Sequence, residues 1–122
     1  MGQEYLIDTC VVIKYLNKNY TEEVLLKLDD LVDSKSNISF ICKIELLVWN
    51  PSNESDMNIW EKFVKGSNVY SLTNDIIDLT ISIRKETKIK IPDAIIAATS
   101  ILYDYTLLTD NKTDFDKVIS LG

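Results

Sequence analysis

The sequence predicts an α/β fold, a three-layer sandwich with a central, mostly parallel sheet of four or five strands and helices on both faces. Short apolar runs, typical of buried strands, alternate with longer stretches whose apolar residues recur every three or four positions. Strands separated by helical stretches imply parallel pairing, because the chain must cross back before each new strand. A chain of 122 residues, 46% hydrophobic and 26% charged, fits a single globular domain over 1–122.

The first half of the chain predicts two strands and three helices. An apolar strand is expected over residues 5–8, and Thr9 is expected to cap the helical segment VVIKYLN. Thr21, followed by two glutamates that favour a helix N-terminus, opens a second helix. After the polar segment SKSN, residues 38–41 form the second expected strand, which runs into a short helix over 43–48.

The second half repeats this alternation. A helix is expected from Ser52 to Gly66, followed by a strand over 68–72 and a long helix that Thr73 caps. Pro92 suits the first turn of a helix, and that helix is expected over 93–103. The last strands are expected at TLLT and, beyond a loop or short helix at DNKTDFDK, at VIS.

Composition excludes several kinds of chemistry. The chain has no histidine, which excludes imidazole acid–base catalysis and histidine-bound zinc. Two cysteines are too few for a zinc tetrad or a disulfide framework, and three scattered glycines cannot form a phosphate-binding loop. No apolar run is long enough to span a bilayer and no secretory signal opens the chain, so a cytoplasmic protein with no membrane partner is expected.

Carboxylates follow the predicted strands. Asp8 ends the first strand, Glu45 lies in the helix after the second, and Asp93 opens the helix near the end of the chain. Asp110 and Asp114 flank the loop after TLLT. In parallel α/β sheets, ligands bind beyond the carboxyl ends of the strands, and these acids are expected to converge there.

Each acid also has a purely structural explanation. Asp93 can stabilise a helix N-terminus, Asp114 can be surface charge, and Glu45, which lies among apolar residues and is expected to be buried, can belong to an ion pair. Taken together, carboxylates about 5 Å apart repel by roughly 3 kcal/mol per pair. A fold that gathers them must protonate some or bind a cation, and Mg²⁺ or Mn²⁺ matches all-oxygen ligands.

Four segments of the chain carry a resemblance to a known family: YLIDTCVVIKYL, ISFICKIELLVW, IPDAIIAATS and LLTDNKTDF. In order and spacing they resemble the PIN-domain ribonucleases, specifically the VapC-like toxins of toxin–antitoxin pairs. The resemblance implies an endoribonuclease that hydrolyses RNA phosphodiester bonds with Mg²⁺, for which Mn²⁺ is a plausible substitute. By the matching motifs, the catalytic and metal-binding acids are Asp8, Glu45, Asp93 and Asp114.

The sequence departs from the family pattern at a few positions. Cys10 stands where Asn or Ser is usual, and Cys42 where Thr is common, so changed packing around the site is expected. Asp110, Asn111 and Asp114 are alternatives for the last acid, and Asp114 is favoured.

Neutral and basic residues complete the expected site. Thr9 and Thr109 can bond a carboxylate or a scissile phosphate, although helix capping or turn formation explains them equally well, and Ser39 is similarly open. Because the chain has a net charge of −6, phosphate contacts must come from particular basic residues near these motifs. The candidates are Lys14, Lys43, Arg84, Lys88, Lys90 and Lys112.

The resemblance also implies two protein partners. Family members usually form homodimers, and a cognate antitoxin inserts a peptide, often with an arginine, among the acids. A bidentate arginine–carboxylate pair would compete directly with the metal.

Three other functions are alternatives to the nuclease, and the sequence argues against each of them. A phosphoacceptor receiver domain needs an acid pair after the first strand, whereas Asp8 has no adjacent acid. An aspartyl-phosphate hydrolase needs a second Asp where Cys10 stands. A catalytically silent PIN fold that acts only as a binding module remains an alternative, against which the full acid set argues.

Overall fold

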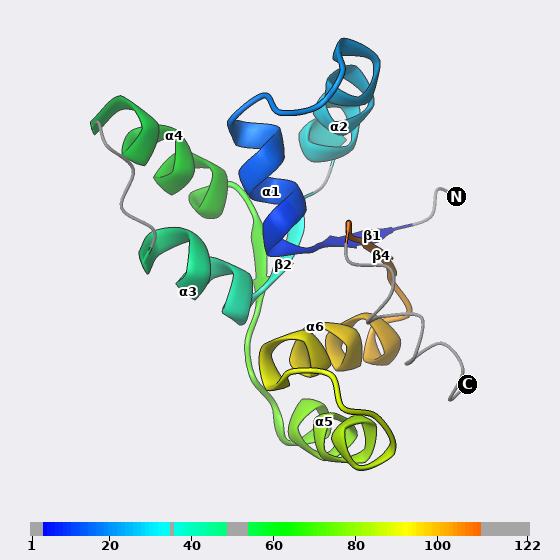
Figure 1. Cartoon of the computed structure of the whole chain (residues 1–122). Helices are drawn as coiled ribbons and strands as arrows, with labels where there is room; N and C mark the ends of the chain where they lie inside the picture. The colour runs from blue at the N-terminus through cyan, green and yellow to red at the C-terminus, as the bar shows by residue number, and fades with distance from the viewer. Residues whose placement is uncertain (1–3, 35, 49–53, 111–122) are drawn as a thin grey trace.

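The computed structural model describes residues 4–34, 36–48 and 54–110 (Figure 1). Within this part, helices and strands alternate as the sequence predicts. In chain order they are β1 (Tyr5–Ile7), α1 (Thr9–Leu16), α2 (Glu22–Ser34), β2 (Asn37–Ser39), α3 (Phe40–Val48), α4 (Glu54–Lys65), β3 (Asn68–Tyr70), α5 (Asn74–Glu86), α6 (Ile91–Leu102) and β4 (Thr106–Leu108).

The strands pair in parallel, as predicted, but only in twos. β1 pairs with β4, placing Ile7 opposite Leu108, and β2 pairs with β3, placing Ser39 opposite Tyr70. The prediction of one sheet of four or five strands is therefore not confirmed, since the described strands form two separate ladders. The fifth strand expected at VIS lies outside the described residues.

A buried asparagine joins the two ladders. The Asn37 side chain, 1% exposed, donates from Nδ2 to the backbone oxygen of Tyr5 on β1 at 3.0 Å. Its Oδ1 accepts a bond from Nδ2 of Asn68 on β3 at 3.1 Å. A side-chain amide thus connects β1 and β2, which share no ladder among the described residues.

Two hydrophobic clusters lie on opposite faces of the strands. Leu6 and Leu107 contact the cluster that α5 and α6 build, whereas their neighbours Ile7 and Leu108 contact the cluster around α1, α3 and α4. Successive strand residues point to opposite faces, so each strand contributes to both clusters. Figure 1 shows the same arrangement, with the strands between α5 and α6 on one side and α1 to α4 on the other.

Helix starts differ from the sequence predictions at two places. The cap of α1 is Asp8, whose side chain accepts a bond from the backbone N–H of Thr9, so Thr9 is the first helical residue. α3 begins at Phe40, three residues earlier than expected, because the Ser39 hydroxyl accepts a bond from the Ile41 N–H and ends the strand. The predicted cap of α5 at Thr73 is confirmed.

In the described part of the chain, no helix combines the length and apolarity needed to cross a membrane.

Candidate metal centre

Asp8 lies directly after β1 and is 5% exposed. Its Oδ1 accepts a bond from the Thr9 N–H at 2.8 Å, and its Oδ2 accepts bonds from the Thr109 hydroxyl at 2.7 Å and the Cys10 thiol at 3.3 Å. All three donors are neutral. The buried carboxylate is thus oriented from both paired strands while no positive side chain of the described residues contacts it.

Thr9 connects Asp8 to the second predicted acid. The Thr9 hydroxyl donates to Oε1 of Glu45 at 2.7 Å, although the two residues are 36 positions apart. This contact forms because α1 packs against α3. Glu45 is exposed, which corrects the expectation of a buried carboxylate: the apolar residues beside it, Ile44 at 52% and Leu47 at 37%, are exposed as well.

Both cysteines border these acids as free thiols. Burial, followed by the negative charge of Asp8 among smaller causes, raises the pKa of Cys10 above its usual value. Burial also raises the pKa of Cys42 to about 12, and the charges of Asp8 and Glu45 act in the same direction. The thiols therefore stay protonated at neutral pH, so that Cys10 serves as a donor to Asp8 and neither is a ready nucleophile.

Asp110 has a different environment, two residues after β4. Its Oδ2 lies 2.9 Å from Lys14 Nζ and accepts a bond from the Tyr20 hydroxyl at 2.8 Å. The hydrogen bond with Lys14 is the main cause that lowers the pKa of Asp110, and the same bond raises the pKa of Lys14. Asp110 is thus neutralised by Lys14, one of the candidates for a phosphate contact.

Asp93 and Asp114 are the remaining predicted acids. Asp93 is half-buried in the first turn of α6, which packs against α3. Asp114, Asn111 and Lys112 lie outside the described residues. Across residues 4–34, 36–48 and 54–110, no three His, Cys, Asp or Glu side chains are close enough together to hold a metal ion. The structure therefore brings together Asp8 and Glu45, and does not place Asp93 in such a group.

The donors around Asp8 and Glu45 nevertheless fit a hard divalent cation. An ionised carboxylate offers about four acceptor sites, and the described residues give Asp8 three neutral donors and Glu45 one. Oxygen lone pairs thus remain on a buried or partly shielded negative charge. Mg²⁺ binds through one or two carboxylates plus water and substrate oxygens, which suits such a pair.

Sequence reasoning identified the hydroxyls of this site but not all of its donors. Thr9 and Thr109 were expected to bond a carboxylate, and both do. Ser39 only caps a helix start. The thiol of Cys10 as a donor to Asp8 and the Tyr20 hydroxyl on Asp110 were missed. The position of Cys10 in the first turn after Asp8 could have indicated its contact with that carboxylate. No feature of the sequence indicated the contact between Tyr20 and Asp110.

Comparisons with known proteins agree on the fold. The family model for the PIN domain matches residues 5–120. A toxin–antitoxin complex from Klebsiella pneumoniae contains a chain 26% identical, with a TM-score of 0.72 and coverage of 92% of this chain and 90% of that one.

Two further solved structures show the same fold at lower identity. FitAcB from Neisseria gonorrhoeae is 21% identical, with a TM-score of 0.80 and coverage of 94% of this chain and 93% of that one. VapBC-1 from nontypeable Haemophilus influenzae is 22% identical, with a TM-score of 0.77 and coverage of 97% and 94%. Among curated proteins none gives a significant match.

Proposed function

Since the chain belongs to the PIN-domain family, we propose that it is a metal-dependent endoribonuclease and the toxin of a toxin–antitoxin pair. It hydrolyses RNA phosphodiester bonds with Mg²⁺, for which Mn²⁺ can substitute. The receiver-domain and aspartyl-phosphate alternatives are set aside by the family match over residues 5–120.

One observation supports this proposal above the others: Asp8 is 5% exposed, and every donor that the described residues give it is neutral. Burying an ionised group is costly unless an opposite charge compensates it. Asp110 has its compensating cation in Lys14, whereas Asp8 has none among the described residues. A bound divalent cation would supply that compensation.

The proposed roles of the residues follow from their contacts. Asp8 and Glu45 hold the cation, and Thr9 fixes both, since its N–H bonds Asp8 and its hydroxyl bonds Glu45. Thr109 orients the second oxygen of Asp8 from β4. By the family motifs, Asp93 and Asp114 complete the ligand set. When bound, the cation supplies an activated water and stabilises the charge of the leaving oxygen.

The proposal includes partners. The Klebsiella pneumoniae neighbour is described as a toxin–antitoxin complex, which supports a cognate antitoxin for this chain. An antitoxin arginine would pair with the same carboxylates and displace the metal. We also propose a homodimer, a single domain over 1–122 and action in the cytoplasm, where the RNA substrate is found.

The test compares Asp8→Asn and Asp93→Asn with Asp78→Asn, a matched change at an exposed position on α5. Asn is as good a helix cap as Asp, so Asp8→Asn keeps the start of α1. We expect Asp8→Asn and Asp93→Asn to lose growth arrest and Mg²⁺-dependent RNA cleavage, at least about 100-fold in kcat/KM, or about 2.7 kcal/mol. Asp78→Asn should cleave RNA like the parent chain, and EDTA should stop both. Undiminished cleavage by Asp8→Asn would refute the site.

One observation favours a second candidate, a catalytically silent PIN fold that only binds a partner. In the described part of the chain, no group of three potential ligands is close enough to hold a metal. The same experiment separates the two functions, because a silent module shows no cleavage at any Mg²⁺ concentration even in the parent chain.

A further inference from the structure

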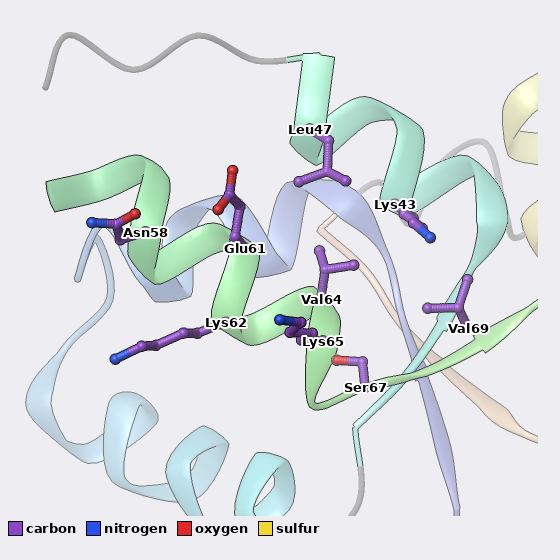
Figure 2. Close-up of a pocket in the computed structure, with 9 residues that line it drawn as sticks. All are labelled: Lys43, Leu47, Asn58, Glu61, Lys62, Val64, Lys65, Ser67 and Val69. Carbon is purple, nitrogen blue, oxygen red and sulfur yellow. The ribbon is translucent and has the colours of Figure 1, made fainter. Parts of the chain in front are cut away.

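A pocket of about 760 Å³ lies between α3, α4 and β3. Figure 2 shows Lys43 from α3 at one side of it and Lys65 from the last turn of α4 at the other, with Val64 between them and Val69 on β3 near Lys43. Lys62 also lines the pocket, and its amino group extends away from Lys43. The pocket therefore gathers three lysines of a chain whose net charge is −6.

No ion pair in the described part of the chain includes these lysines. The ion pairs of the described residues join Lys14 to Asp110 and Lys27 to Glu23, and none involves a lysine of the pocket. Glu61 lines the same pocket without pairing to them, and Figure 2 places it beside Asn58. The part between Lys43 and Lys65 is therefore locally positive, which is unusual on an acidic protein and favours an anionic ligand.

We propose that this pocket binds the phosphodiester backbone of RNA, as a phosphate subsite outside the Asp8–Glu45 centre. The proposal rests on the proposed function, because it assigns the pocket to the same substrate. It explains how a polyanion can dock on an acidic chain: phosphate contacts come from an unpaired lysine cluster rather than from the overall charge.

RNA fits the pocket better than an acidic peptide does. A peptide in a groove needs exposed apolar surface for its anchoring side chains. Val64, between the lysines, is only 7% exposed and belongs to the core cluster, and Val69 packs against that cluster. Leu47, 37% exposed, is therefore the main apolar anchor point of the lining, whereas lysine ammonium groups need no apolar surface to bind phosphate.

The position of Lys43 connects the pocket to the metal centre. Lys43 and Glu45 lie two residues apart on α3, about 3 Å along the helix axis and on different sides of it. Glu45 faces Thr9 and the pocket lies toward α4. One RNA strand that crosses the outer face of α3 can therefore place one phosphate at Lys43 and another, further along the strand, near Glu45.

The test measures RNA binding without cleavage. A fluorescent oligouridylate is titrated with the full chain in EDTA at several KCl concentrations, and fluorescence anisotropy gives the affinity at each. The variant K43Q/K65Q is compared with K27Q/K85Q, which removes the same charge from exposed positions outside the pocket. Loss of two phosphate contacts should reduce the slope of log affinity against log salt by about 1.4, and the control should keep the parent slope.

Each outcome is decisive. A parent-like slope for K43Q/K65Q overturns the subsite. Poly-glutamate is titrated in the same way, and a K43Q/K65Q variant that loses poly-glutamate binding but keeps RNA binding also overturns it, because the pocket would then be an acidic-peptide site. If the double variant fails to fold by circular dichroism, K43Q and K65Q are measured singly, each with an expected slope change of about 0.7. Cleavage by Asp8→Asn tests the proposed function separately, so the nuclease can fail while the RNA subsite stands, and the reverse.

Discussion

Asp8 and Asp110 follow two strands that pair side by side, yet their surroundings are opposite. Asp8, next to β1, is buried and bonded by a backbone N–H, a hydroxyl and a thiol. Asp110, after β4, has a side chain 39% exposed and bonded to Lys14 and Tyr20. One carboxylate is held in place with no cationic partner among the described residues, and the other is ion-paired on the surface.

This contrast indicates what would separate the proposed metal ligand from a structural acid at the same edge of the fold. Both residues follow a strand end, so this position does not distinguish a metal ligand from a structural acid. The donors distinguish them, because neutral donors orient a carboxylate without compensating its negative charge. The three predictions below test the contrast, in order of decreasing effect.

The largest expected effect is on stabilisation by metal. A cation that binds only the folded chain adds about 2.7 kcal/mol at a hundred times its Kd. For a chain of this size that is about 10 °C in Tm. Asp8→Asn should lose this Mg²⁺-induced shift in a thermal melt, and Asp110→Asn should keep it. The contrast fails if both variants keep the shift or if Asp110→Asn is the one that loses it.

A smaller effect is expected at Thr9, whose hydroxyl orients Glu45. Groups that position metal ligands typically contribute 10- to 100-fold to metal affinity or activity. Thr9→Val, which removes the hydroxyl at nearly constant volume, should weaken Mg²⁺ affinity by about tenfold in calorimetric titration. Thr9→Ser keeps the hydroxyl and should bind like the parent. Equal losses in both variants would indicate a packing defect instead.

The smallest effect concerns the pH dependence of the Lys14–Asp110 pair. The pKa of Asp110 is lowered from 3.8, so its contribution to stability is present above that value and is lost as pH falls through the lowered pKa. The pKa of Lys14 is raised from 10.5, so its contribution is present below that value and is lost as pH rises through the raised pKa.

The Tm of the parent minus that of Asp110→Asn should therefore be positive and constant between these limits. It should shrink at both extremes of pH. Lys14→Gln, which removes the other partner, should give the same profile. A difference that does not vary with pH would mean that the pair contributes nothing to stability.

Much of the fold could be predicted because helix and strand periods are local properties of the sequence. Thr73 and Gly66 marked helix boundaries that the structure confirms. The early start of α3 was missed because the apolar residues 40 and 41 read equally well as strand or helix, and the Ser39 side chain decides between them. The division of the described strands into two ladders could not be predicted, because periodicity does not record tertiary contacts such as the bond from the Asn37 amide to Tyr5.

For the candidate site, too, some features could be predicted from the sequence and others could not. Asp8 could be found because an acid at the end of an apolar strand is a local signal. The partners of Asp110 could not, since Lys14 and Tyr20 are 96 and 90 residues away in the chain. The exposure of Glu45 was missed because its apolar neighbours suggested burial, whereas this side of α3 lies at the surface. Asp114 stays a prediction.

The Asn37 amide has a consequence for the geometry of the candidate metal centre. It ties the strand before Asp8 to the strand before α3, and its two bonds suit only one alignment of the chains. Sliding either strand by a residue would turn that amide away and carry Thr9 out of reach of Glu45. Two oxygens that belong to distant parts of the polypeptide thus owe their spacing to a group that touches neither of them.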